Sequence, residues 1–178
     1  MRLFIAVNFS DDIKNLIMEA EENLRSQSLR GSFTRKENLH LTLAFLGETP
    51  EDRLSCLCGL MEKIRAPGFE VVFKHTGCFT HSHKELWWIG AEPDCPGLRQ
   101  LRDLHTRLNS LLLEAGFPVD TRPFNAHISL GREIKHNGEI ILVSPEIVVP
   151  VNRISLMKSE HIKGVLTYTE LFSVEAEG

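Results

Sequence analysis

The most informative feature of the chain is a short pattern that occurs twice, in ENLHLTLAFLG at residues 37–47 and in RPFNAHISLGR at residues 122–132. In a β-strand the side chains at i and i+2 point to the same face. His40 and Thr42 therefore lie together on one face of a strand, as do His127 and Ser129, while the leucine and isoleucine residues between them face the other way. Two such pairs facing one groove would supply a general acid, a general base and two hydroxyl donors, which can act on a phosphodiester without a metal ion.

The pattern alone leaves an alternative open. Chance is expected to produce about 0.2 copies of the full alternating pattern in a chain of this composition, so two copies are improbable. Both histidines would nevertheless be unremarkable if they lay on ordinary strands with one solvated face.

Composition limits the classes of protein to which this chain could belong. Its 178 residues are 42% hydrophobic and 25% charged, values typical of one globular domain. The formal charge of −4 argues against broad electrostatic coating of nucleic acid, so any contact with nucleic acid must be local. No apolar run approaches the length of about 18 residues that a membrane span requires, and the apolar start is too short for a signal peptide. We therefore expect a cytoplasmic protein with no membrane partner.

The four cysteines do not predict a disulfide framework in a cytoplasmic chain of this size. Cys56 and Cys58 are spaced like a pair of metal ligands, but they fall in a predicted helix, where residues i and i+2 face different directions. Packing is the favoured interpretation of Cys58.

Hydrophobic periodicity predicts an alternation of strands and helices. The predicted helices cover residues 11–27, 49–64 and 96–115, with Gly116 in the left-handed position that ends the third. Predicted strands cover residues 3–7, 40–45, 69–73, 86–91, the segment with His127, and segments near 139–142, 145–149, 153–158 and 167–175. Turns are predicted at 30–32, around 81–84 and at 135–138. This order indicates an α+β fold of two similar lobes, each presenting one histidine pattern to a shared central groove.

The chain resembles the two-histidine (2H) phosphoesterase superfamily, and within it the RNA 2′,3′-cyclic phosphodiesterase branch, historically called 2′-5′ RNA ligases. The resemblance extends over nearly the whole chain, because RLFIAV at 2–7, LWWIG at 86–90, SLMKS at 155–159 and Tyr168 also match. Two residues depart from the family pattern. Ser129 stands where threonine is usual, and Ala126 stands where proline is common.

The resemblance implies a single bilobal domain over residues 1–178, with two pseudo-symmetric lobes, antiparallel sheets around a central groove, and helices outside. It also implies hydrolysis of RNA 2′,3′-cyclic phosphate ends to 2′-phosphate, with no metal or other cofactor, and reversible 2′-5′ RNA ligation. The partners would be RNA 3′ ends or nucleotides bearing the cyclic phosphate, and the protein would be a monomer. His40 would be the proton donor and His127 the proton acceptor.

These roles agree with the chemistry of the side chains. Histidine has an ordinary pKa of about 6.5, so both of its protonation states are available near neutral pH. Thr42 and Ser129 would donate hydrogen bonds to the phosphate oxygens. Arg132 lies an odd number of residues after His127, so it contacts phosphate only if Gly131 permits a bulge, and otherwise is a surface charge. Tyr168 would stack on a base or a ribose, or be an ordinary strand aromatic.

Three other functions remain open. A metal hydrolase is suggested by His81 and His83, although no helical His-x-x-x-His pair is present. A binding module of the same fold would hold RNA ends without turning them over. A 2H enzyme for another substrate, such as 2′-5′ oligoadenylate or a small cyclic nucleotide, would use the same catalytic groups.

Overall fold

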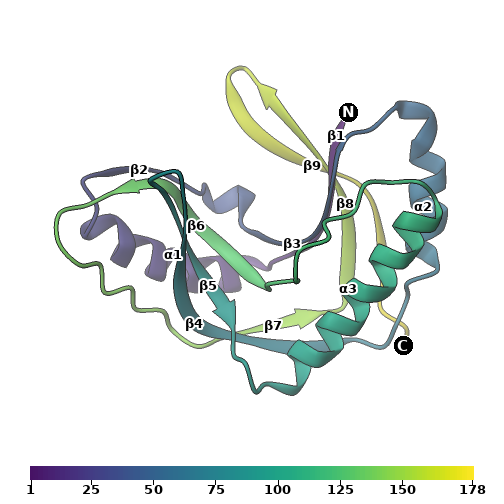
Figure 1. The fold of residues 1–178 in the computed structure, drawn as a ribbon. Coiled ribbons are helices and arrows are strands. Elements are labelled where there is room, and N and C mark those ends of the chain that lie inside the picture. The colour runs from purple at the N-terminus through teal and green to yellow at the C-terminus, as the bar shows by residue number, and fades with distance from the viewer.

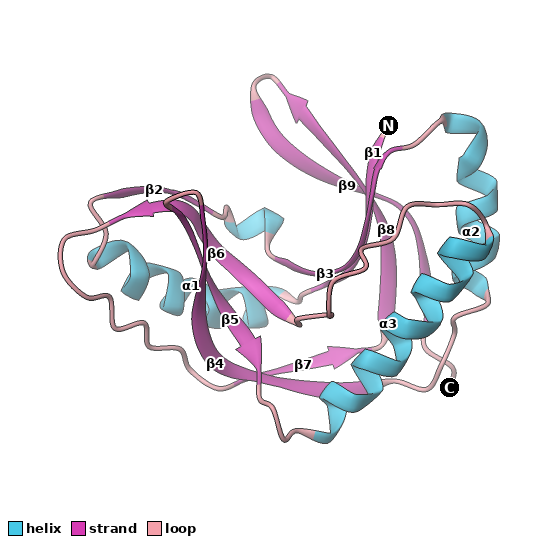
Figure 2. Cartoon of the chain, in the orientation of Figure 1, coloured by secondary structure: helices cyan, strands magenta, loops and turns pink.

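A computed structural model describes residues 1–178, which form two antiparallel sheets and three α-helices (Figures 1 and 2). The four-stranded sheet has the order β3 (His40–Glu48), β1 (Arg2–Asn8), β8 (Arg153–Ile162), β9 (Val165–Glu175). The five-stranded sheet has the order β2 (Arg30–Phe33), β6 (His127–Lys135), β5 (Lys84–Ala91), β4 (Phe69–His81), β7 (Ile147–Val151). The helices are α1 (Asp11–Ser26), α2 (Leu54–Glu62) and α3 (Pro96–Glu114). The α+β class with two antiparallel sheets is confirmed.

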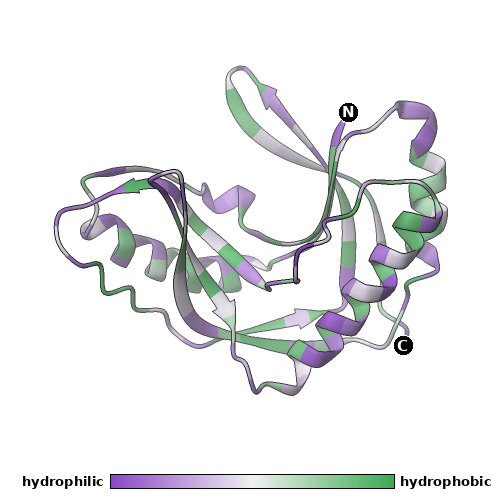
Figure 3. Ribbon diagram, viewed as in Figure 1, coloured by the Kyte–Doolittle hydropathy of each residue, from purple (hydrophilic) through white to green (hydrophobic).

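The helices pack on the outer faces of the sheets. Helix α1 packs against β6 and β7, α3 against β4 and β3, and α2 against β9. Apolar residues recur every three to four positions along α1 and α3 (Figure 3), so each helix turns one stripe toward the sheets. One continuous core of 37 buried residues joins both sheets and all three helices. The opposite faces of the two sheets are therefore free to carry the site.

Local sequence explains the best-predicted elements. Residues Leu3 to Val7 are all buried, as expected for a central strand. Ser10 caps α1 by accepting a hydrogen bond from the backbone N–H of Ile13 at 3.3 Å, and two aspartates occupy its first turn. None of the helices is long and apolar enough to cross a membrane.

Two predicted segments are wrong. Residues 30–32, predicted as a turn, belong to strand β2, which pairs with β6. Residues 139–142, predicted as a strand, lie outside the sheets, although Ile140 and Leu142 are buried. The side-chain amide of Gln27, which caps the end of α1, takes the place of a neighbouring strand there, because it hydrogen-bonds both the N–H and the carbonyl of Ile141.

Several boundaries also differ. The second helix begins with a 3₁₀ turn at Glu51–Arg53 and is α-helical only over Leu54–Glu62. The strand predicted at 145–149 lies at Ile147–Val151. Strand β4 continues to His81, eight residues beyond the predicted end, and joins β5 through Ser82 and His83, whose φ angles are 49° and 63°.

Candidate active site

The first histidine pair lies at the start of β3. Leu41 and Leu43 are buried in the core, so His40 and Thr42 occupy the opposite face of the sheet. The Nδ1–H of His40 donates to the Asn38 carbonyl at 2.7 Å, because a carbonyl oxygen can only accept. This places the basic nitrogen of the neutral ring at Nε2, which lies 2.8 Å from the Thr42 Oγ1. In the neutral ring Nε2 therefore accepts the hydroxyl hydrogen of Thr42, so His40 is held through both ring nitrogens, with Nε2 on the side of the hydroxyl.

The second pair repeats this arrangement at the start of β6. Ile128 and Leu130 are fully buried, and His127 and Ser129 lie on the opposite face. The Nδ1–H of His127 donates to the Asn125 carbonyl at 2.8 Å, again two residues earlier in the chain. The two imidazoles are therefore anchored in the same way from the two sheets.

A bulge in β6 redirects the residues that follow Ser129. Trp88 on β5 pairs with Ser129, but the preceding residue, Trp87, pairs with Gly131, so Leu130 is the extra residue. One extra residue reverses the alternation of faces. Arg132 then lies on the same face as His127, and its charge acts on both histidines.

Both imidazoles are biased toward the neutral form. Burial lowers the pKa of His40, as do the charges of Arg132, His127 and Lys14, against an opposing hydrogen bond to Asn38. Burial also lowers the pKa of His127, with Arg132 acting in the same direction and the Asn125 carbonyl opposing it. Positive charge is thus disfavoured on either ring until an anion binds. Such a site suits a phosphate group, which would offset the charge of Arg132.

Aromatic rings pack around His40. Tyr168 of β9 lies edge-on to the imidazole, with ring centroids 5.3 Å apart, and also packs against Phe4 at 4.9 Å. Phe4 itself lies 4.9 Å from His40. The structure thus brings Tyr168 to the first histidine, although it lies 128 residues away in the chain (168 minus 40).

The two tryptophans of β5 face opposite sides. Trp87 packs against the core, and its Nε1–H donates to the Glu85 carboxylate at 2.8 Å. Trp88 faces His127, with ring centroids 6.3 Å apart. Phe79 of β4 lies nearer, 5.2 Å from His127 and edge-on. The sequence prediction missed Phe79 because it ended this strand at residue 73, and continued strand pairing was the signal that would have found it.

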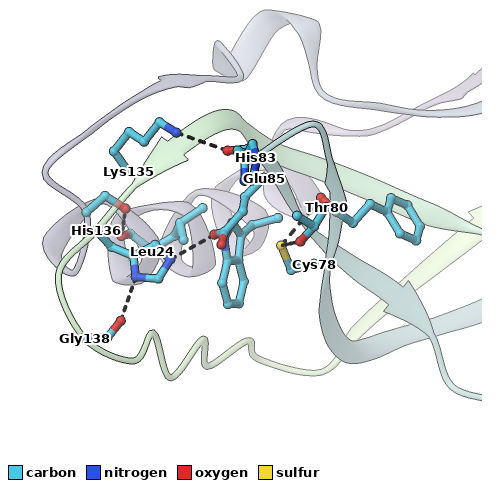
Figure 4. Close-up of polar contacts among 11 residues, drawn as sticks. Leu24, Cys78, Thr80, His83, Glu85, Lys135, His136 and Gly138 are labelled. Carbon is cyan, nitrogen blue, oxygen red and sulfur yellow. Dashed lines mark hydrogen bonds and ion pairs between the residues drawn. The ribbon is translucent and has the colours of Figure 1, made fainter.

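A second polar cluster joins Glu85 of β5 to His136, the residue after β6 (Figure 4). Both ring nitrogens of His136 face oxygen atoms, the Gly138 carbonyl at 2.7 Å and the Glu85 carboxylate at 2.9 Å. Although burial opposes it, hydrogen bonds from Trp87 and His136 hold the pKa of Glu85 below its usual value. This cluster ties the end of β6 to β5, and we assign it no part in the chemistry.

The other chemically notable residues lie apart from the two pairs. His81 and His83 are exposed at the β4–β5 turn, and no three His, Cys, Asp or Glu side chains gather closely enough to hold a metal ion. All four cysteines are free thiols, and burial raises the pKa of Cys58.

Known proteins share both the sequence and the fold. A family model described as LigT like Phosphoesterase matches residues 7–88. The RNA 2′,3′-cyclic phosphodiesterase of Thermus thermophilus is 32% identical, with 99% of this chain and 92% of the relative aligned. The RNA 2′,3′-cyclic phosphodiesterase of Escherichia coli is 30% identical, with 96% and 93% aligned.

Solved structures extend this similarity to three dimensions. The crystal structure of E. coli LigT in apo form superposes with a TM-score of 0.84 at 28% identity, covering 99% of this chain and 98% of that one. E. coli LigT complexed with 3′-AMP gives the same TM-score and coverage. The chain therefore belongs to the LigT-like phosphoesterases of the two-histidine (2H) superfamily.

Proposed function

We propose that this protein hydrolyses the 2′,3′-cyclic phosphate at RNA 3′ ends to a 2′-phosphate. The observation that carries the proposal is the pair of equivalently anchored imidazoles, each beside a hydroxyl and both under the influence of Arg132. The names of the related proteins from T. thermophilus and E. coli support the same activity.

The reaction needs one proton removed and one delivered. In the proposed roles, Nε2 of His127 takes a proton from water while the water oxygen forms a bond to phosphorus. The bond between phosphorus and the ribose 3′-oxygen breaks, and Nε2 of His40 delivers a proton to that oxygen. The two imidazoles end with exchanged protonation states and reset through solvent. No metal ion or other cofactor takes part in this scheme.

The remaining site residues stabilise charge or position the acid. Thr42 and Ser129 would donate hydrogen bonds to the non-bridging phosphate oxygens, and Arg132 would pair with their negative charge. The bound anion would also raise the pKa of His40 from its lowered value and so favour the imidazolium form that the proton donor requires. Tyr168 would orient His40 and offer its ring to the ribose or base.

The biological setting follows from the substrate. We infer that residues 1–178 act as one monomeric unit in the cytoplasm on RNA 3′ ends or on nucleotides that carry the cyclic phosphate. Reversible 2′-5′ ligation would use the same groups, with a ribose 5′-hydroxyl in place of water.

Product analysis on a short RNA ending in a 2′,3′-cyclic phosphate tests the proposal. The expected product is the 2′-phosphate, formed equally well with EDTA present. Alanine at His40 or His127 should each reduce turnover by at least about 10²-fold, whereas the exposed His81→Ala serves as a matched control and should have little effect.

Other outcomes point elsewhere. A 3′-phosphate product would move the protein to another branch of the superfamily. Binding without turnover would favour the RNA-end binding module, and turnover only of 2′-5′ oligoadenylate or of a mononucleotide would favour the other 2H substrates. Loss of activity in EDTA would contradict the proposed mechanism.

A further inference from the structure

Two aromatic side chains in contact with each other lie beside His127. Phe79 of β4 and Trp88 of β5 have ring centroids 5.1 Å apart, inclined at 39°. Trp88 is buried, with 8% of its surface exposed, whereas Phe79 is 39% exposed. The buried indole thus supports an exposed phenyl ring.

The sheet is shaped to accept this indole. A Cβ atom at Gly77 would lie 2.4 Å from Cζ2 of Trp88, and a Cβ atom at Gly90 would lie 2.7 Å from Cζ3. Gly77, which pairs with Trp88 from β4, and Gly90, two residues further along β5, therefore let the indole lie flat across the sheet. The indole Nε1–H is buried without a hydrogen-bond partner. This costs free energy that a purely apolar ring in the same place would not lose. The indole thus fills a space that the two glycines leave open, and it lies beneath the exposed ring of Phe79.

Phe79 and Trp88 lie beside only one of the two histidines. Phe79 and Trp88 both contact the ring of His127, at 5.2 and 6.3 Å between centroids. The rings around His40 form a different group, made by Phe4 and Tyr168, with the exposed Phe45 packed on Phe4 at 6.3 Å between centroids. The proton acceptor thus has an exposed aromatic ring of its own, separate from the group at His40.

This side is where the nucleophile enters. In an in-line displacement the entering and leaving oxygens lie on opposite sides of phosphorus. The ribose that carries the cyclic phosphate keeps its leaving 3′-oxygen near His40, so the group beside His127 is the nucleophile. A water molecule gains no binding energy from an apolar ring. A nucleoside does, because every base has a face that can stack on an aromatic ring.

We propose that Phe79, supported by Trp88, stacks the base of a second nucleoside whose 5′-hydroxyl replaces water at His127. This inference rests on the proposed function. His127 takes the 5′-hydroxyl proton, the 5′-oxygen bonds to phosphorus, the bond from phosphorus to the 3′-oxygen breaks, and His40 protonates that oxygen. The product is a 2′-5′ phosphodiester, and the reverse steps cleave it. Phe79 therefore sets how often a nucleoside, and not water, captures the phosphate.

Competition between nucleophiles tests this site. The full chain is incubated with a short RNA ending in a 2′,3′-cyclic phosphate and with added adenosine, or with methanol as a nucleophile that cannot stack. The ratio of diester to 2′-phosphate is measured by mass spectrometry, and this ratio does not depend on the overall rate. For wild type, adenosine capture should saturate and exceed methanol capture at equal concentration.

Substitutions at Phe79 should change only the capture of the nucleoside. Phe79→Leu should lower the adenosine ratio by about 5- to 150-fold, which corresponds to a stacking energy of about 1–3 kcal/mol. The methanol ratio should stay the same, and Phe79→Tyr should retain adenosine capture. Leu113→Ala removes an apolar side chain that is 64% exposed on α3, and as the control it should alter neither ratio.

The possible failures are distinguishable. A wild-type protein that forms 2′-phosphate but captures adenosine no better than methanol would overturn the stacking site alone, as would equal adenosine capture by the Leu and Tyr variants. Absence of any 2′-phosphate would overturn the proposed function, and the stacking site with it.

Discussion

Replacing Glu21 with glutamine is expected to stabilise the protein above neutral pH. Glu21 lies on the core-facing side of α1, and only 1% of its surface is exposed. One carboxylate oxygen accepts a hydrogen bond from Arg25 at 3.0 Å, while the other, Oε2, is buried without a partner. Burial raises the pKa of Glu21 from 4.5 to about 7, although Arg25 opposes the shift. Ionised Glu21 therefore destabilises the fold.

The size of the effect follows from the pKa shift. From 4.5 to about 7, at about 1.36 kcal/mol per pKa unit, the shift corresponds to about 3 kcal/mol. Solvent around the half-exposed Arg25 partly solvates the Glu21 carboxylate, which reduces the destabilisation by ionised Glu21 toward about 2 kcal/mol. Because the folded-state pKa of Glu21 is raised, its contribution to stability is complete below about pH 4.5 and is lost as the pH rises through about 7.

Urea unfolding at about pH 4 and about pH 8.5 measures this effect. Glu21→Gln should unfold with nearly the wild-type free energy at the lower pH and should gain about 2–3 kcal/mol relative to wild type at the higher pH. Glu19→Gln, an exposed change on the same helix, is the matched control and should show no such pH dependence. A Glu21→Gln advantage that is the same at both pH values would refute the reasoning.

Three further predictions concern the site and its support. Because Arg132 lowers the pKa of both histidines, Arg132→Met should move both limbs of the kcat/KM profile to higher pH, whereas Lys14→Met should move one limb only; parallel shifts in both variants would contradict this. Thr42→Val should lower kcat/KM by about 10²- to 10³-fold while the serine variant retains activity, and equal rates for the two would exclude a role for the hydroxyl. Gly90→Ala should cost about 1–3 kcal/mol in urea unfolding because its Cβ would meet the indole that lies across it. Gly59→Ala, which meets open space inside helix α2, is its control and should lose no stability, and a Gly90→Ala variant as stable as wild type would show that the sheet adapts.

The elements predicted best are those with strong local periodicity. The buried run in β1 and the apolar stripes of α1 and α3 need only their own residues to be recognised. Segments that depend on a partner were predicted wrongly. Strand β2 has mostly exposed residues and is a strand because it pairs with β6. Residues 139–142 have the pattern of a strand but are held by Gln27, which caps the end of α1.

The candidate site divides in the same way. That an imidazole and a hydroxyl share a face at positions 40 and 42, and again at 127 and 129, is a consequence of strand geometry and was readable from the chain. The bulge at Leu130, which turns Arg132 toward the site, depends on how β6 is paired with β5.

By itself, the sequence determined the two histidine pairs, the alternation of buried and free faces, and the membership in a family that the comparisons confirm. Only the tertiary structure decided that Tyr168 packs on His40, that Arg132 acts on both imidazoles, and that Phe79 stands over a flat indole beside His127. The physical reason is how far apart in the chain the interacting residues lie. Alternation along a strand is set by neighbouring residues, whereas these contacts depend on the pairing, bulging and curvature of strands that lie far apart in the chain.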